Sequence, residues 1–180
     1  LKENPEISHG VALTSPLLKI NFPEFVYPVF KKITSLQCKI NCENYVFGGA
    51  DWDITSKHNQ FGGNVLTSDK RRFLIQRQWF VQNPDLQVGS VTWAWLNNAF
   101  KTTDSLRKDA GLESLSVPFF IAGAGKDHLV KTSEAEKLSE RMKNSKYLHI
   151  PNSQHEILME TDTIRRTYLN KMDAFIDHCL

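Results

Sequence analysis

Asp127 and His155 are the two side chains whose types and spacing could carry out chemistry. Asp127 follows the apolar run Val117–Ala122, and His155 lies four residues beyond Pro151, which stops the run Lys146–Ile150. If both runs are parallel strands, the two side chains meet at the edge where open α/β sheets carry functional groups. A histidine that donates one ring N–H to a carboxylate can accept a hydroxyl proton at its other nitrogen. The pair therefore predicts nucleophilic catalysis, with Asp127 as the orienting acid and His155 as the base.

The same two residues also have an ordinary structural interpretation. An Asp after a strand often caps a helix or lies in solvent, and a His in a loop is usually a surface residue. The spacing alone therefore leaves the catalytic interpretation open.

The elements around the pair read as strand, helix and strand. Val117–Ala122 is almost wholly apolar, as is typical of a strand buried on both faces of a parallel sheet. Ser133 and Glu136 have the spacing of a capping box, and Ala135, Leu138 and Met142 follow at helical intervals. This pattern predicts a crossover helix between two parallel strands.

The rest of the chain predicts one more strand and mainly helices. Val11–Thr14 is a short apolar strand, and the segment from Asn21 to Lys32 reads as a helix interrupted by Pro28. From Gln37 to Gly63 we expect a long loop, with Asp51, Asp53 and His58 as solvated residues rather than metal ligands. Three further helices are predicted: Asp69–Gln82 capped by Thr67 or Ser68, Val91–Lys108 stopped at Gly111, and Thr161–His178.

Three stretches of the chain resemble segments of known enzymes. NSQHEILMETDTIR, residues 152–165, resembles a loop that carries a catalytic histidine, and residues 64–100 are similar to a cap that covers the substrate. VALTSP, residues 11–16, is similar to the strand and turn that follow a nucleophile helix. In all three, the chain resembles α/β-hydrolases of the bacterial lysophospholipase and monoacylglycerol-lipase type. The resemblance implies the C-terminal part of an α/β-hydrolase: mainly parallel strands, crossover helices and an inserted helical cap.

The resemblance also implies a domain layout and roles for further residues. Residues 1–20 would be a strand of the hydrolase core, 21–112 the cap, and 113–180 the C-terminal core with Asp127 and His155. Glu156, Glu160 and Arg165 match the family's pattern, and we assign them to holding the histidine loop. Trp93, Trp95 and Phe100 are the expected substrate-lining residues of the cap.

The chain contains no G-x-S-x-G pentapeptide, the turn that presents the nucleophilic serine in this fold. Ser15 and Ser90 lack the two flanking glycines. Because the order in this fold is serine, acid, histidine, we expect the serine upstream of Leu1, in a missing N-terminal hydrolase segment. This chain alone is then predicted to be inactive. A non-catalytic scaffold, or another activity on the same fold such as a peptidase or dehalogenase, remains an alternative.

The charge of the chain argues against a nucleic acid as its partner. The net charge is +2 with mixed signs, without the basic patch that indicates nucleic-acid binding. The expected partner is a lipid-like ester substrate, with no cofactor and no metal. We expect a cytoplasmic protein whose membrane contact is peripheral, at the inner membrane. Arg71, Arg72 and Arg77 could meet phospholipid head groups, although a solvated helix face is the simpler interpretation.

Cys38, Cys42 and Cys179 are interpreted as free thiols, because no neighbouring ligands complete a zinc site.

Overall fold

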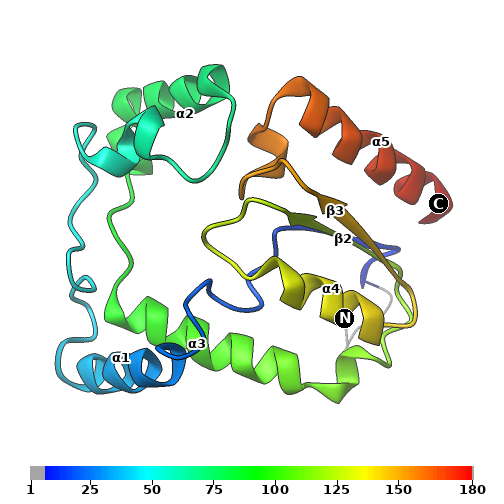
Figure 1. The fold of residues 1–180 in the computed structure, drawn as a ribbon, viewed down its shortest axis with the longest axis horizontal. Coiled ribbons are helices and arrows are strands. Elements are labelled where there is room, and N and C mark those ends of the chain that lie inside the picture. The colour runs from blue at the N-terminus through cyan, green and yellow to red at the C-terminus, as the bar shows by residue number, and fades with distance from the viewer. Residues whose placement is uncertain (1–6, 180) are drawn as a thin grey trace.

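A parallel sheet of three short strands lies at the centre of the chain (Figure 1). The structure is a computed structural model that describes residues 7–179. The strands are β1 (Val11–Thr14), β2 (Phe119–Ala124) and β3 (Ser145–Ile150), in the order β1-β2-β3. Both pairings are parallel, so the C-terminal ends of the strands lie at one edge of the sheet. This arrangement confirms the predicted α/β class.

The middle strand, β2, is covered on both faces. On one face Phe119 and Ile121 pack against α4, which spans Thr132–Arg141. On the other face Phe120 packs against α5, which spans Asp162–Cys179. Figure 1 shows the two helices on opposite sides of the sheet. All six residues of β2 are buried, which confirms a buried strand here, although it begins and ends two residues later than the predicted Val117–Ala122.

Three longer helices and their loops connect β1 to β2. They are α1 (Tyr27–Asn41), α2 (Lys70–Gln82) and α3 (Trp93–Lys108). Helices α1 and α3 lie side by side, and α2 lies apart from them, towards the loop that joins β3 to α5 (Figure 1). Short 3₁₀ turns complete the described chain at Lys57–Asn59, Phe61–Gly63, Pro84–Leu86, Ala110–Leu112 and Ile157–Met159.

The predicted interruption of α1 at Pro28 is wrong. The helix begins at Tyr27, so Pro28 lies in the first turn, where its missing N–H costs no helical hydrogen bond. The N–H groups of Val26 and Tyr27 donate to the carbonyl of Pro23, which sets the turn into the helix. The helix then continues to Asn41, so the predicted loop from Gln37 begins five residues too early.

The predicted caps of α2 are also wrong. Asp69 caps the helix, because its Oδ1 accepts the Arg72 N–H at 3.0 Å. The Thr67 hydroxyl instead donates to the Met159 carbonyl at 2.6 Å, and the Ser68 hydroxyl donates to Glu160. Both hydroxyls form hydrogen bonds with residues far away in the sequence, Met159 and Glu160, so the local sequence does not identify the cap.

The predicted capping box of α4 is wrong, whereas the predicted end of α3 at Lys108 is confirmed. Helix α4 starts at Thr132 after Lys131 without a side-chain cap, so Ser133 lies inside the helix and forms no capping box. Helix α3 is capped by Thr92 and ends at Lys108, and Gly111 lies in the 3₁₀ turn that follows it.

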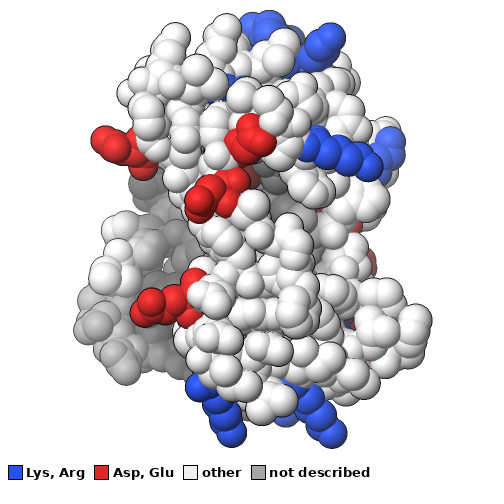
Figure 2. Space-filling view, turned by 90° about the vertical axis from the view of Figure 1, so that its left-hand side faces the viewer, with Lys and Arg blue, Asp and Glu red and all other residues white. Residues whose placement is uncertain are grey.

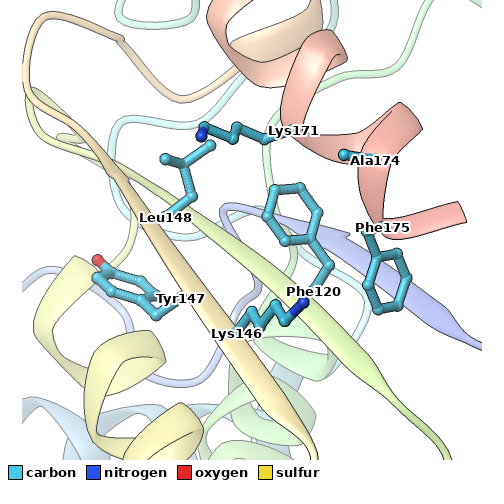
Figure 3. A pocket seen from close by; sticks show the side chains of 7 residues that line it. All are labelled: Phe120, Lys146, Tyr147, Leu148, Lys171, Ala174 and Phe175. Atoms are coloured by element: carbon cyan, nitrogen blue, oxygen red, sulfur yellow. The ribbon is translucent and has the colours of Figure 1, made fainter. Parts of the chain in front are cut away.

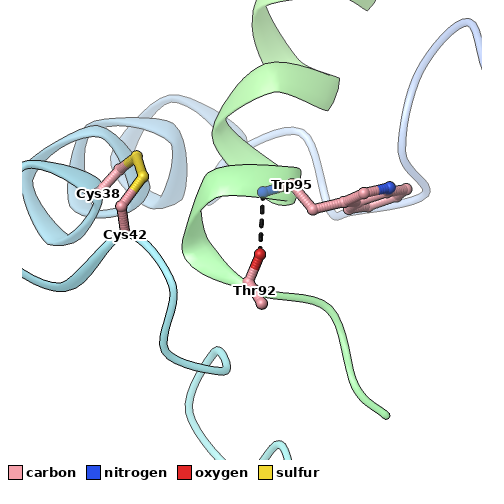
Figure 4. The surroundings of a disulfide bond; sticks show 4 residues. All are labelled: Cys38, Cys42, Thr92 and Trp95. Atoms are coloured by element: carbon pink, nitrogen blue, oxygen red, sulfur yellow. Dashed lines mark hydrogen bonds between the residues drawn. A yellow bond between two sulfur atoms is a disulfide. The ribbon is translucent and has the colours of Figure 1, made fainter. Parts of the chain in front are cut away.

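The prediction that Cys38 and Cys42 are free thiols is wrong, because they form a disulfide at the end of α1 (Figure 4). The helix ends at Asn41, and the turn there brings the two Cα atoms to 3.9 Å. Cys179 is a free cysteine, as predicted.

The three arginines of α2 do not form one solvated basic face. Arg72 pairs with Asp69 and Asp162, whereas Arg77 is 8% exposed, with its guanidinium 4.7 Å from the centre of the Phe73 ring. Only Arg71 of the three is exposed. Within residues 7–179, no helix combines the length and the apolar character needed to cross a membrane.

Candidate active site

The acid loop that follows β2 fixes the carboxylate of Asp127. Its Oδ1 accepts the backbone N–H groups of Leu129 and Val130, at 2.8 and 2.9 Å. The side chain is fully buried, and its second oxygen, Oδ2, lies 2.8 Å from Nδ1 of His155. The predicted acid and base are therefore in direct contact, and between residues 7 and 179 no side chain forms a hydrogen bond with Nε2 of the imidazole.

The contact shifts the pKa of both groups. Burial by itself would raise the pKa of Asp127, but the hydrogen bonds from His155, Val130 and Leu129 outweigh burial and lower it. For His155, the hydrogen bond to Asp127 raises the pKa above its usual value and outweighs the opposing effect of burial. The pair therefore favours a carboxylate beside an imidazole that readily holds a proton.

Main-chain contacts hold the acid loop against the histidine loop. The Gly125 N–H donates to the Ile150 carbonyl at 2.9 Å, and the Lys126 N–H donates to the Ser153 carbonyl at 2.8 Å. A Cβ on Gly125 would lie 2.5 Å from the carbonyl oxygen of Pro151, closer than side-chain carbons approach backbone. Glycine at this position therefore lets the two loops approach closely enough for the Asp127–His155 contact.

Glu160 joins the histidine loop to the chain before α2. Its carboxylate is fully buried and accepts the Gln154 N–H at 2.7 Å. The same carboxylate accepts both the N–H and the hydroxyl of Ser68. The Glu156 N–H adds a bond to the Leu66 carbonyl at 2.8 Å. This geometry fits the structural role assigned to Glu160, and its partner Ser68 is a site residue that the sequence analysis missed.

Ser15, at the end of β1, is a second residue that the sequence analysis did not assign to the site. It has φ +42°, the only positive φ outside glycine among the described residues. Its hydroxyl donates to the main-chain carbonyl of His155 at 2.8 Å. Between residues 7 and 179, no serine hydroxyl is hydrogen-bonded to the His155 ring. Ser15 therefore supports the histidine loop from the strand beside β2.

An apolar cavity of about 480 Å³ opens beside His155. Trp95 lies on its wall, whereas Trp93 and Phe100 are buried in the cluster that packs α3 against α1. Figure 4 shows the Trp95 side chain projecting from α3 away from the disulfide. The lining residues are mostly aliphatic and aromatic: Ser15, Leu17, Ile20, Phe22, Phe30, Val46, Val91, Trp95, Leu96, Leu129, Val130 and His155.

A second cavity, of about 650 Å³, lies between β3 and α5 (Figure 3). Phe120 and Phe175 line it, together with the stems of Lys146 and Lys171. None of the predicted site residues borders it. Of these two cavities, only the one beside His155 borders the contact between Asp127 and His155.

Residues 1–162 match the family described as serine aminopeptidase, S33, a hydrolase family. The chain belongs to this family. Among curated relatives, the probable lysophospholipase L2 of Haemophilus influenzae is 28% identical over 135 residues, which cover 75% of this chain and 41% of that protein. Lysophospholipase L2 of Escherichia coli is 22% identical over 186 residues, covering 98% of this chain and 53% of that protein. The chain thus spans about half the length of these relatives.

Solved structures confirm the fold. A soluble variant of the monoglyceride lipase from Saccharomyces cerevisiae has a TM-score of 0.69 at 19% identity, covering 99% of this chain and 58% of that chain. The monoacylglycerol lipase of Paleococcus ferrophilus has a TM-score of 0.66 at 14% identity, covering 98% and 62%. The resemblance to α/β-hydrolases of the lysophospholipase and monoacylglycerol-lipase type is confirmed.

Proposed function

We propose that the protein containing this chain is a serine ester hydrolase for lysophospholipids or monoacylglycerols. The observation that carries the proposal is the 2.8 Å contact between Asp127 and His155 beside an apolar cavity. The names of the relatives in this family support the same substrate class.

In the proposed reaction, Asp127 keeps the proton of His155 on Nδ1, so that Nε2 accepts the proton of a serine hydroxyl. The serine attacks the ester carbonyl, and His155 then returns the proton to the departing alcohol. A water repeats the sequence and releases the fatty acid. Since no G-x-S-x-G occurs in the chain, we place the serine and the oxyanion amides in a part of the protein outside residues 1–180. This chain alone would then be inactive.

The cavity supports an acyl chain as the group that is bound. Its lining has no Asp or Glu and only two residues, Ser15 and His155, with polar side chains apart from the indole of Trp95. Burial of a methylene group in such a cavity is worth about 0.8 kcal/mol. We therefore assign the cavity to the acyl chain, with Trp95 as a wall.

The family's description as aminopeptidases makes peptide cleavage the second candidate. An aminopeptidase must bind the ammonium group at the N-terminus of its substrate, and a carboxylate is the usual partner of a buried cation. The described lining of the cavity holds no carboxylate. This composition favours the ester of a fatty acid over a peptide.

Labelling with a serine-reactive fluorophosphonate tests the proposal. The full-length protein should be labelled, the His155→Ala variant should lose most of the label, and residues 1–180 alone should not react. Hydrolysis of monoacylglycerol and of lysophospholipid by the full-length protein would then identify the head group. A folded full-length protein that takes no label would contradict a serine mechanism.

A further inference from the structure

The segment between β1 and α1 is joined to the acid loop. It contains residues 17–22, LLKINF, which we call the strap. Within it Ile20 forms an isolated antiparallel bridge with Val130, and the two backbone hydrogen bonds that flank this bridge are both 2.9 Å long. The bridge therefore fixes the chain that follows Asp127 from its outer side.

Asn21 of the strap contacts the acid loop twice. Its Nδ2 donates to the main-chain carbonyl of Asp127 at 3.1 Å, and its N–H donates to the Leu129 carbonyl at 2.9 Å. The N–H groups of Leu129 and Val130 in turn donate to Oδ1 of Asp127. Asn21 therefore holds both ends of the turn that positions the Asp127 carboxylate, although its own side chain is exposed and does not line the cavity.

An ion cluster lies across the same junction. The carboxylate of Glu24 pairs with Lys19 of the strap at 2.8 Å and with Lys131 of the acid loop at 3.2 Å. The Glu24 side chain is 64% exposed, and ion pairs that are open to solvent contribute little to stability. The backbone bridge and the Asn21 side chain are therefore the contacts that matter most at this junction.

The strap and the acid loop also form part of the cavity beside His155. Five lining residues come from these two segments: Leu17, Ile20 and Phe22 from the strap, and Leu129 and Val130 from the acid loop. A ligand that fills this part of the cavity therefore touches both segments at the point where they are bridged.

These contacts are apolar, and the nearby surface is poor in charge. The cavity is lined by no Asp, Glu, Lys or Arg. Figure 2 shows the side of the molecule where α1, α2 and the chain between them lie. Basic side chains project from its upper and lower edges, acidic side chains lie between them, and most of the surface is uncharged. The property of a ligand to which the strap responds is therefore the length of its apolar chain rather than its charge.

We propose that the strap couples occupancy of the cavity to the position of Asp127, with Asn21 as a positioning residue. The inference rests on the proposed function, because it takes the cavity as the acyl site. A long acyl chain packs against the strap and the acid loop together and holds Asp127 towards His155. A short chain leaves this part of the cavity empty, so that the bridge and Asn21 alone hold the acid. Binding energy from the apolar chain then serves to orient the groups that react.

Hydrolysis of nitrophenyl esters by the full-length protein tests the coupling. Asn21→Ala removes one donor to the acid loop and leaves the lining of the cavity intact. We expect kcat to fall about ten-fold for the butanoate ester and about two-fold or less for the dodecanoate ester, with KM for the dodecanoate unchanged. The matched control is Asn144→Ala, because Asn144 is also exposed and donates to a backbone carbonyl, that of Ser116, at 2.7 Å. This variant should keep the wild-type kcat for both esters.

A second measurement does not require hydrolysis. The Nδ1 proton of His155, in its hydrogen bond to Asp127, should give a downfield ¹H NMR signal, which His155→Ala identifies by its loss. Asn21→Ala should weaken this signal in the free protein. Decan-1-ol, which fills the cavity, should restore it, whereas butan-1-ol should not.

Several results would overturn the inference. An equal loss of kcat for both esters would give Asn21 a structural role only, and an unchanged kcat or an equal loss in Asn144→Ala would give it no specific role. If the full-length protein hydrolyses no ester, the proposed function fails and the NMR signal decides about the strap alone. An unchanged signal in Asn21→Ala, or an equal response to both alcohols, would then contradict the coupling. A wild type without the signal would also contradict it, because there would be no hydrogen bond to position.

Discussion

The loops after β2 and β3 and the helices between β1 and β2 are held in different ways. The two loops are fixed by directional polar contacts, including the buried carboxylates of Asp127 and Glu160. Helices α1 and α3 are held mainly by aromatic and aliphatic packing around Trp93 and Phe100. They also leave apolar side chains of α1 in solvent, among them Val29, Leu36 and Ile40.

The difference fits the role that we propose for each region. Proton transfer depends on atoms held within a few tenths of an ångström, and hydrogen bonds supply that direction. An acyl chain needs apolar area rather than direction, and burial of apolar surface is non-directional. Changes in the loops should therefore alter chemistry at a nearly constant fold, whereas changes in the helical region should alter stability or substrate choice.

The largest effect is expected for Asp127→Asn in the full-length protein. The amide keeps the shape but no longer holds the His155 proton on Nδ1, so kcat should fall by about 10⁴. Hydrolysis of a soluble ester measures this change, and circular dichroism checks that the fold is kept. A loss below about ten-fold would show that the pair is structural.

The pH dependence of the rate, compared between the wild type and Asp127→Asn, tests the same contact in a second way. His155 must be neutral to accept a proton, and its contact with Asp127 raises its pKa. The rate of the wild type should therefore rise with pH on an acidic limb that lies above the usual pKa of histidine. In Asp127→Asn the raising partner is lost while burial remains, so the pKa of His155 should fall and the limb should move to lower pH. NMR titration of the His155 ring protons measures this pKa directly.

Two tryptophans of α3 separate residues that stabilise the helical region from residues that line the cavity. Trp93 is 3% exposed in the α1–α3 cluster, so Trp93→Ala should lower the free energy of unfolding by about 3–5 kcal/mol. Trp95 lines the cavity and is 49% exposed, so Trp95→Ala should cost much less stability and change the preferred acyl length instead. Urea unfolding and rates on esters of increasing chain length measure the two effects. Equal stability losses would remove the distinction between core and cavity wall.

Glu160→Gln tests whether the histidine loop depends on a buried acceptor. The carboxylate accepts from Gln154 and Ser68, and a glutamine nitrogen would face some of these donors with another donor. We expect about 2 kcal/mol of lost stability and a kcat lower by about ten- to a hundred-fold. Glu113→Gln is the matched control, because Glu113 forms an exposed ion pair with Arg141 and its loss should change neither value. A wild-type kcat in Glu160→Gln would show that the loop holds its position without this acceptor.

The sequence predicts the sheet and the contact between Asp127 and His155 well because both depend on local signals. Val11–Thr14 and the buried run that forms β2 read directly as strands, and parallel strands bring the loops after them to one edge. The contact between Asp127 and His155 then follows from chain order. The structural role of Glu160 came from the resemblance to a family, since nothing in its local sequence indicates a fully buried carboxylate.

Long-range contacts account for most of what the sequence could not predict. Thr67 and Ser68 are residue types that often cap helices, yet their hydroxyls donate hydrogen bonds to residues about 90 positions away in the sequence. Arg77 has the composition of a surface residue, yet the rings of Phe73 and Phe80 cover it. The strained backbone of Ser15 has no signature beyond a serine before a proline.

The smallest effect is expected for the disulfide between Cys38 and Cys42. The bridge spans a sequence separation of four, and a loop this short removes little entropy from the unfolded chain, about 2 kcal/mol at most. Replacing both cysteines by serine should therefore lower Tm by a few degrees and leave the pKa of His155 unchanged, because the bridge lies at the end of α1. Calorimetry and the NMR titration of His155 test both parts. A shifted pKa would mean that α1 and the acid–base pair are mechanically coupled, so the helical region could not be treated as independent of the chemistry.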